Sequence, residues 1–516
     1  MKTIEHARAT RREWIGLAVL SLPCLLYSMD LTVLNLAVPH LTADLQPSAA
    51  QLLWIVDIYG FLLAGFLITM GTLGDRIGRR KLLMLGAAAF GAASVLAAMS
   101  TSAEMLIGAR ALLGVAAATL APSTLSLIRN MFLDARQRTF AIGVWIASFS
   151  AGGAIGPLVG GVLLEYFWWG SVFLVAVPLM VLLLILGPML LPEFRDPKAG
   201  RLDLYSAALS LTAVLAVIYG MKRIAEDGVA WLPLLTIVAG LAIGTVFVRR
   251  QRKLADPLID LRLFRAPAFS ASLAINILCL FVAFGSFLFI AQYLQLVLGM
   301  GPLEAGMWTV PSGIAFIIGS MLTPRIAHDI RTAYVIAGGF ALSALGFCML
   351  TQIGGNGLWV LIVGYAIFSL GLAPVATLTT DLIVGIAPPE RAGAASAISE
   401  TSFEFGGALG IAVLGSVVTA MYRSVMAAAA PHDVSSETLE VARDTLGGAV
   451  AMALQLNDQR GVELLAAARD AFTQSLELTA AICAAITIVG AVIALTLLRR
   501  VGAHAERHAN LNAARV

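Results

Sequence analysis

The sequence predicts an all-α membrane protein with fourteen transmembrane helices. Hydrophobic residues make up 59% of the 516 and charged residues only 13%, whereas a soluble domain carries about 25% charged residues. Apolar runs of roughly 20 residues, the length that spans a bilayer, recur along the whole chain. They fall at about 14–39, 51–73, 82–100, 103–128, 138–164, 170–191, 202–221, 229–249, 268–298, 303–327, 333–352, 356–384, 392–422 and 474–499.

The basic residues indicate the orientation of these spans. If both termini are cytoplasmic, most of the 34 Lys and Arg residues fall in tails and loops on the cytoplasmic side, as the positive-inside rule requires. The opposite orientation would reverse this bias. The exceptions are Arg110, which lies within a span, and Lys222, Arg223, Arg423, Arg443, Arg460 and Arg469 on the outer side.

An internal repeat predicts two related halves. SFSAGGAIG, from Ser148 to Gly156, matches SFEFGGALG, from Ser402 to Gly410, at an offset of 254 residues. Each copy lies in the fifth span of a six-span block if the blocks are spans 1–6 and 9–14. We therefore expect an N-terminal six-helix bundle (1–195), two inserted helices (196–255), a C-terminal six-helix bundle (256–500) with an external loop (423–473), and a cytoplasmic tail (501–516). The loop has helical periodicity, which fits either a lid over the outer mouth or a helical hairpin without that role.

Carboxylates inside the predicted spans are the strongest functional signal. Asp30, Asp57, Glu400 and Glu404 lie in stretches otherwise apolar enough to cross a bilayer, where a charge costs at least about 2.5–3.5 kcal/mol. Glu400 and Glu404 are four residues apart, so on a helix they project from one face. We interpret these acids as proton or cation sites on a path through the membrane. For Asp57 the alternative is a structural ion pair with Arg110.

A buried acid can hold a proton or a lipophilic cation, but the two compete for it. That competition gives obligatory exchange driven by the proton gradient, so we expect no cofactor. Asp381, near the cytoplasmic end of its span, is interpreted as an interfacial residue instead. Aromatic side chains could add cation–π contacts, although in spans they usually only pack; the candidates for a substrate pocket are Tyr59, Phe281, Phe284, Phe403 and Phe405.

Two further motifs predict conformational elements. GTLGDRIGRRKLL occupies 71–83, between spans 2 and 3, where Asp75 can lie near a helix N-terminus or an arginine and form a charged latch. In span 5, small residues allow another helix to pack closely and Pro157 bends the span. The residues of the first motif are Gly71, Asp75, Arg76, Gly78 and Arg79, and those of the second are Gly143, Gly152, Gly156, Pro157, Gly160 and Gly161.

These motifs resemble those of the fourteen-helix drug:proton antiporters of the major facilitator superfamily, over nearly the whole chain. The loop at 71–83 is similar to the superfamily's signature loop, and the span 5 pattern to the motif that separates antiporters from symporters. MDLTVLNLAVP, at 29–39, resembles the first-span motif of the fourteen-helix branch, and Arg110 matches a fourth-span arginine implicated in proton transfer. WIVDIYGFLLAGF, at 54–66, resembles exporters of quaternary ammonium compounds and methyl viologen.

The resemblance implies a proton-coupled multidrug antiporter of the bacterial inner (plasma) membrane. It would export lipophilic mono- and dicationic compounds such as quaternary ammonium biocides, dyes and methyl viologen, as a monomer in contact with membrane lipids and with no nucleic-acid partner. Carboxylates in span 13 of that branch are tied to proton coupling and cation recognition, and Glu400 and Glu404 match their positions. Some members also carry an acid in span 10, whereas this chain has none between Met307 and Thr323. The alternative is a proton-coupled transporter of a metabolite or amino acid on the same scaffold.

The sequence supports neither ATP binding through a Walker A loop nor metal-dependent chemistry. The chain contains no Gly-Lys dipeptide, so a Walker A loop is excluded. It has no HExxH motif, and its four cysteines form no CxxC pair, which argues against a metal site. We therefore expect neither an enzyme nor a metal-binding protein.

Overall fold

The computed structural model describes residues 9–47, 49–195, 203–227, 230–254, 257–388, 391–429, 436–456 and 458–499. The predicted tail at 501–516 lies outside them. Within the described residues the regular structure is helical. The N-terminal half contains α1 (Arg11–Leu45), α2 (Ala49–Ile77), α3 (Arg79–Ala98), α4 (Ala103–Met131), α5 (Ala135–Tyr166), α6 (Ser171–Leu174) and α7 (Ala176–Leu190).

The rest of the chain continues the helical pattern. The inserted pair is α8 (Leu204–Asp227) and α9 (Trp231–Gln251). The C-terminal half contains the short helix η1 (Leu263–Arg265), α10 (Pro267–Gln292), the π-helical turn η2 (Tyr293–Val297), α11 (Pro302–Asp329), α12 (Thr332–Leu350), α13 (Ile353–Ile386), α14 (Ala392–Ala429), α15 (Ser436–Asp444), α16 (Leu446–Leu456) and α17 (Gln459–Leu497).

The helices confirm a multi-pass membrane protein. Among the described residues, 13 helical segments are long and apolar enough to cross a membrane, with α6 and α7 together forming one of them. The remaining expected span lies in α1, a helix of 35 residues that packs along α5.

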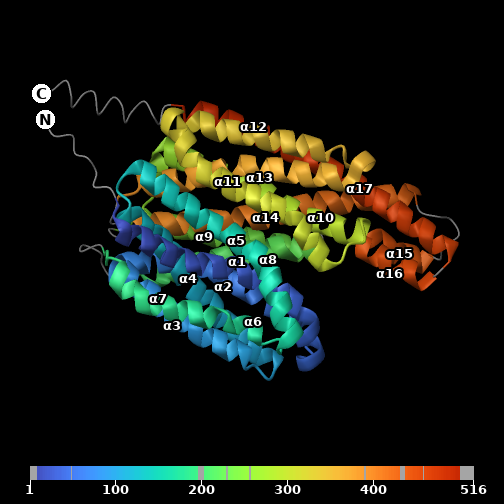
Figure 1. Ribbon diagram of the computed structural model, residues 1–516, viewed down its shortest axis with the longest axis horizontal. Coiled ribbons are helices and arrows are strands. Elements are labelled where there is room, and N and C mark those ends of the chain that lie inside the picture. Colours follow the sequence, from blue (N-terminus) through green and yellow to red (C-terminus); the bar gives the residue numbers. More distant parts are fainter. Residues whose placement is uncertain are drawn as a thin grey trace, which may run out of the picture.

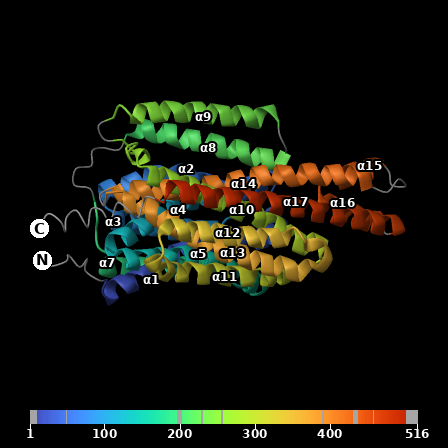
Figure 2. The ribbon, with the colours of Figure 1, turned by 90° about the horizontal axis from the view of Figure 1, so that it is seen from above.

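Two helix bundles lie side by side, and the inserted pair flanks them. In Figures 1 and 2, α1–α7 form one bundle and α10–α14 with α17 form the other. The bundles meet where α5 contacts α11 and α13, and where α14 contacts α2 and α4. The hairpin of α8 and α9 packs against α2 and α14 at one side of this interface. A site between the bundles would therefore be lined by α2, α4 and α5 from one bundle and by α11, α13 and α14 from the other.

The repeated glycine motif makes the same kind of contact in both bundles. A Cβ atom added to Gly152 of α5 would lie 2.2 Å from the carbonyl oxygen of Leu25 in α1. In the other bundle, a Cβ added to Gly406 of α14, the equivalent of Gly152 at the offset of 254 residues, would lie 2.8 Å from the carbonyl oxygen of Ile277 in α10. Only glycine permits such close backbone approach, so the repeat seen in the sequence is a repeated helix crossing.

The region predicted as an external loop is helical and extends the C-terminal bundle. Helices α14 and α17 have 38 and 39 residues, which corresponds to about 57 Å each, nearly twice the hydrocarbon thickness of about 30 Å. With α15 and α16 they project beyond the bundle (Figure 2). The Tyr422 hydroxyl donates a 2.8 Å hydrogen bond to the Ala442 carbonyl and ties α15 to α14. The helical hairpin is thus present, while the role of a lid stays a prediction.

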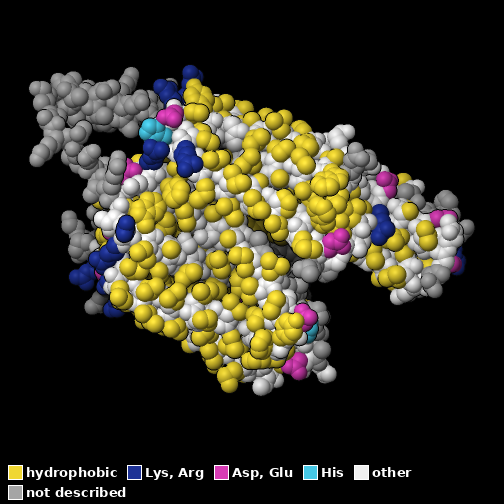
Figure 3. Space-filling model, in the orientation of Figure 1, with side chains coloured by type: hydrophobic (Ala, Val, Ile, Leu, Met, Phe, Trp, Pro, Cys, Tyr) yellow, Lys and Arg dark blue, Asp and Glu magenta, His cyan; other side chains and the backbone are white. Residues whose placement is uncertain are grey.

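The two ends of the molecule differ in the charge of their surface side chains. Figure 3 shows an apolar belt around the bundles and a concentration of Lys and Arg at the end where α1 begins and α17 finishes. We call this the terminal end. Asp and Glu are more frequent at the opposite end in the same view.

Candidate functional site

A buried ion pair joins three helices of the N-terminal bundle. Arg110 of α4 is fully buried, and its Nη1 lies 3.1 Å from Oδ2 of Asp30 in α1. Its Nη2 donates to the carbonyl oxygen of Val56 in α2 at 3.5 Å. The guanidinium also lies 5.1 Å from the ring centroid of Tyr59, within cation–π distance. The cost of burying this arginine is thus offset by a carboxylate and an aromatic face.

The structure pairs Arg110 with Asp30 rather than with Asp57. The structural ion pair considered for Asp57 is therefore not the one observed. Asp57 is partly buried in α2, next to Val56, whose carbonyl accepts from Arg110. It lies close to the pair without being the arginine's carboxylate partner, and its part in transport stays a prediction.

Glu404 links the two bundles. The Tyr27 hydroxyl of α1 donates a short hydrogen bond to Oε1 of Glu404 in α14. Glu400, one turn earlier on α14, is only 8% exposed and interacts electrostatically with Glu404. Within the described part of the chain, Glu400 has no Lys or Arg in an ion pair. The two glutamates therefore lie at the bundle interface, and the deeper one lacks a cationic partner from the protein there.

An aromatic cluster adjoins Glu404 through Tyr27. Ring centroids lie 5.5 Å apart for Tyr27 and Phe149, 6.2 Å for Phe149 and Phe403, and 5.4 Å for Phe403 and Phe284. The ring of Tyr59 also belongs to the cluster, because its centroid lies 6.2 Å from that of Tyr27. Three of the five predicted pocket aromatics, Tyr59, Phe284 and Phe403, thus belong to one cluster that reaches from α2 to α10.

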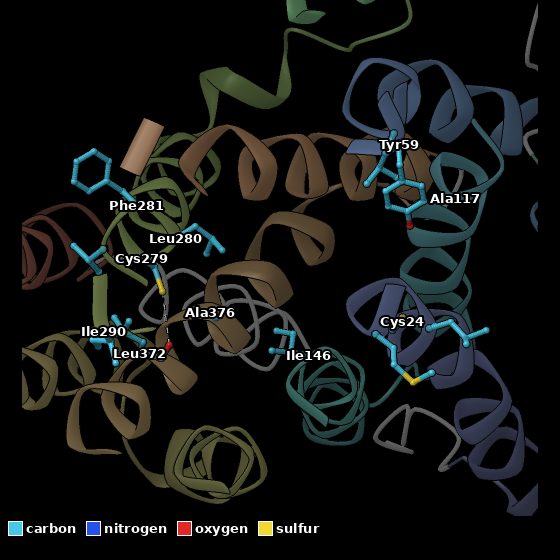
Figure 4. Packing of buried hydrophobic residues seen from close by; sticks show 14 of the residues in the cluster. Cys24, Tyr59, Ala117, Ile146, Cys279, Leu280, Phe281, Ile290, Leu372 and Ala376 are labelled. Atoms are coloured by element: carbon cyan, nitrogen blue, oxygen red, sulfur yellow. Dashed lines mark hydrogen bonds between the residues drawn. The ribbon is translucent and has the colours of Figure 1, made fainter. Parts of the chain in front are cut away.

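The other two predicted aromatics lie elsewhere. Phe281 is buried in the packing of the C-terminal bundle, and Figure 4 shows its ring directed away from Tyr59. Phe405 packs beside the apolar group that includes Ile218 and Met221 of α8. It is two residues from Phe403, about 200° around the helix, so the two rings cannot share a face.

Sequence reasoning overlooked Tyr27 and Phe149, although signals for both exist. Tyr27 precedes Asp30 by three residues and so shares its face of α1. Phe149 occupies the position in the first repeat copy that Phe403 occupies in the second. Applying the offset of the repeat to each candidate aromatic would have identified it.

The latch motif closes α2 against α14. Asp75 accepts hydrogen bonds from the backbone N–H of Gly393 at 3.1 Å and of Ala394 at 3.0 Å, at the N-terminus of α14. It also forms a buried ion pair with Arg79. A Cβ added to Gly71 would lie 2.6 Å from the Gly393 carbonyl oxygen, so glycine is required at this helix crossing. Asp75 thus lies both at a helix N-terminus and beside an arginine, the two settings that its motif predicts.

The remaining motif residues lie around these crossings. Gly78 adopts φ +111°, a left-handed conformation suited to glycine. Arg76 is partly buried and Gly156 is buried. Gly160 packs against Val33, whereas an added Cβ on Gly161 would meet nothing within 4 Å. The side chain of Pro157 lies outside the described residues.

A second contact between the bundles involves a residue that the sequence had not marked as a site. Arg138 of α5 lies 2.7 Å from Oδ1 of Asp381 in α13, and the Thr139 hydroxyl donates to Oδ2 at 2.6 Å. This contact joins the start of α5 to the end of α13, as Asp75 joins the end of α2 to the start of α14. Both therefore close the terminal end, whereas Figure 3 shows the surface hollowed between the bundles at the opposite end.

Comparisons with known proteins agree with this geometry. Residues 20–411 match the Major Facilitator Superfamily. The chain belongs to the major facilitator superfamily. It is 43% identical over 499 residues, 96% of this chain and 99% of the relative, to the multidrug efflux pump LfrA of Mycolicibacterium smegmatis. It is 35% identical over 466 residues, 90% of this chain and 94% of the relative, to the methyl viologen resistance protein SmvA of Salmonella typhimurium.

Solved structures support the fold alone. The human organic anion transporter MFSD10 superposes with a TM-score of 0.60 at 15% identity, covering 94% of this chain and all of that one (100%). Membership of the superfamily identifies this protein as a membrane transporter of small molecules rather than an enzyme.

Proposed function

We propose that this protein is a proton-coupled multidrug exporter of lipophilic cations. It would act as a monomer in the bacterial inner membrane, without a cofactor and with both termini in the cytoplasm. The names of the relatives support multidrug efflux, and that of SmvA supports a dicationic substrate such as methyl viologen. The concentration of Lys and Arg at the terminal end (Figure 3) supports the orientation, because the positive-inside rule assigns that end to the cytoplasm.

The observation that carries the proposal is the acidic pair at the bundle interface. Glu400 is buried without a Lys or Arg ion pair among the described residues, and Glu404 accepts from the Tyr27 hydroxyl. An acid held away from water is stabilised either by a proton or by a cation. The rings of Phe149, Phe284 and Phe403, which belong to the cluster joined to Glu404 through Tyr27, would favour a flat or lipophilic cation.

Exchange follows from that competition. With the terminal end open, a cation from the cytoplasm binds the ionised pair and excludes protons. With that end closed by the Asp75 and Arg138 contacts, the pair faces the opposite side, where protonation weakens cation binding and releases the substrate. Each proton that enters on a membrane potential supplies about 2.3 kcal/mol per 100 mV, so export of a dication requires more than one proton.

Substrate-induced proton release from purified protein tests the proposal directly. We expect ethidium and methyl viologen to release protons from the detergent-solubilised protein, because each displaces protons from the acidic pair. Neutral amino acids should release none. In cells that express the protein, preloaded ethidium should be lost faster than in cells that lack it, and collapse of the proton gradient should remove the difference.

Two results would contradict the proposal. Loss of ethidium that continues at full rate after the gradient has been collapsed would show another energy source. If amino acids cause proton movement and cations do not, the result would instead support the alternative function, a proton-coupled transporter of a metabolite or amino acid.

A further inference from the structure

We propose that protons reach the bundle interface by a route of their own through the N-terminal bundle, with Ser94 as a relay and Phe90 as its gate. This inference rests on the proposed proton-coupled function and deepens it. The route would begin at Asp30 and end at Tyr27, behind the surface that faces the substrate.

The first part of the route is a cavity beside Asp30. It has a volume of about 20 Å³, more than the roughly 10–15 Å³ that one water molecule requires. The residues that line it come from helices α1, α3, α6 and α7 and from Val175, which lies between α6 and α7. They include Asp30, Ser94 and Phe90. No residue of the C-terminal bundle contributes to it, so the cavity lies apart from the bundle interface.

The Ser94 hydroxyl gives this cavity a second polar group. Ser94 is 1% exposed and lines the cavity. Serines in these helices commonly donate to the carbonyl one turn earlier, as Ser148 does to Val144 at 2.8 Å. Ser94 makes no hydrogen bond within the described residues. Asp30 and Ser94 together offer polar partners for a bound water, which such a water needs.

A second cavity continues toward the interface. It measures about 10 Å³ and is lined by Tyr27, Tyr59 and Phe149, among others. The Tyr59 hydroxyl is buried and has no hydrogen-bond partner in the structure, and Tyr27 donates to Glu404. Leu26 and Phe90 line both cavities, so these two apolar side chains form the partition between them.

On this route, Asp30 would exchange its ion pair with Arg110 for a proton and then restore the pair. The charged and titratable groups that face it are Arg110 from α4 and Tyr59 from α2; the cavity residues of α3, α6 and α7 are not ionisable. A proton arriving through the first cavity would bind Asp30 and free Arg110. When the partition opens, that proton would pass to a water in the second cavity and restore the carboxylate. Tyr27 would then give its own proton to Glu404 as it takes one from that water.

A pair of substitutions at Ser94 tests the relay. Ser94→Val and Ser94→Thr add side chains of nearly equal size to the same cavity, but only threonine keeps the hydroxyl. In proteoliposomes with an internal pH dye, we expect Ser94→Val to slow ethidium-driven proton movement by roughly fivefold to tenfold, the equivalent of one lost hydrogen bond. Ser94→Thr should stay close to wild type, and ethidium affinity in detergent should be unchanged in both.

A substitution at Phe90 tests the gate. Phe90→Ala would join the two cavities, so we expect a proton leak in proteoliposomes without any substrate. Phe347→Ala is the matched control, because it removes an equally buried ring from the C-terminal bundle and should cause no leak.

The outcomes separate this inference from the proposed function. If wild-type protein moves protons with ethidium but Ser94→Val does so equally fast, or Phe90→Ala leaks no more than Phe347→Ala, the route is wrong and the function stands. If wild-type protein moves no protons with ethidium, both are wrong.

Discussion

At the scale of single residues, the acids in the predicted spans differ in whether the protein supplies them with a cationic partner. Asp30 is held by Arg110 at 3.1 Å, so within the described residues its charge is already compensated. Glu400 forms no ion pair with Lys or Arg within the part of the chain that the structure describes. A carboxylate that is neutralised by an arginine has less to gain from a drug cation. We therefore propose that the glutamates of α14 recognise the cation and that Asp30 takes up the proton.

Glu404→Gln tests that assignment. A glutamine oxygen can still accept from Tyr27, so the substitution removes the charge and leaves an acceptor for the contact between bundles. Ethidium affinity should fall by roughly 10–100-fold, as expected when a charged partner worth about 1.5–3 kcal/mol is lost. Fluorescence titration of purified protein measures it.

Glu463→Gln is the control, because it removes an exposed carboxylate from α17 and should leave affinity unchanged. Equal ethidium affinity in the Glu404→Gln and wild-type proteins would show that this carboxylate does not recognise the cation.

At the scale of helices, α14 connects the latch to the acids. Its first residues bind Asp75 through Gly393 and Ala394, and Glu404 follows ten residues later, about 15 Å along the helix. One helix therefore carries the contact that closes the terminal end and the carboxylates proposed to bind protons or cations. A shift of α14 would change both together.

Helix crossings in α5 predict which glycines are required. Gly152→Ala would place a Cβ 2.2 Å from the Leu25 carbonyl oxygen, so α1 and α5 must separate. We expect a loss of stability of about 1–3 kcal/mol, seen as a lower thermal unfolding midpoint in detergent.

Gly161→Ala on the same helix is the matched control. Its Cβ would meet nothing within 4 Å, and alanine favours the helix by roughly 0.5–1 kcal/mol, so the midpoint should stay or rise. Equal midpoints for the two variants would contradict the close crossing.

At the scale of the whole molecule, the two bundles are joined at the terminal end and part toward the other. The Asp75 and Arg138 contacts lie at the terminal end, and the hollow in Figure 3 lies at the opposite one. If the terminal end lies in the cytoplasm, as proposed, this arrangement is the conformation that releases substrate outward. The inward conformation must break both contacts.

Asp75→Asn should shift that equilibrium. It weakens an ion pair with Arg79 and two hydrogen bonds to α14, each charge-assisted bond being worth about 1.5–3 kcal/mol. A cysteine at the buried position Ala397, in a Cys348→Ser background, should then react with a water-soluble maleimide at least about tenfold faster.

Asp329→Asn provides the control at the same end, because the Asp329 side chain is 81% exposed. It should leave the labelling rate unchanged. Slow labelling of the Asp75→Asn protein would show that this carboxylate does not hold the bundles together.

The sequence by itself determined the membrane class, the helical spans and the repeat. Long apolar runs can satisfy their backbone polar groups in a membrane only as helices, and glycines at a fixed offset mark equivalent crossings. Only the tertiary structure decided the partners: Arg110 with Asp30, Glu404 with Tyr27, and Asp381 with Arg138. A helical pattern gives the face on which a residue lies, but not which helix faces it. For that reason the sequence could not show that Phe281 and Phe405 lie outside the aromatic cluster, because partners far apart in sequence are chosen by how whole helices pack.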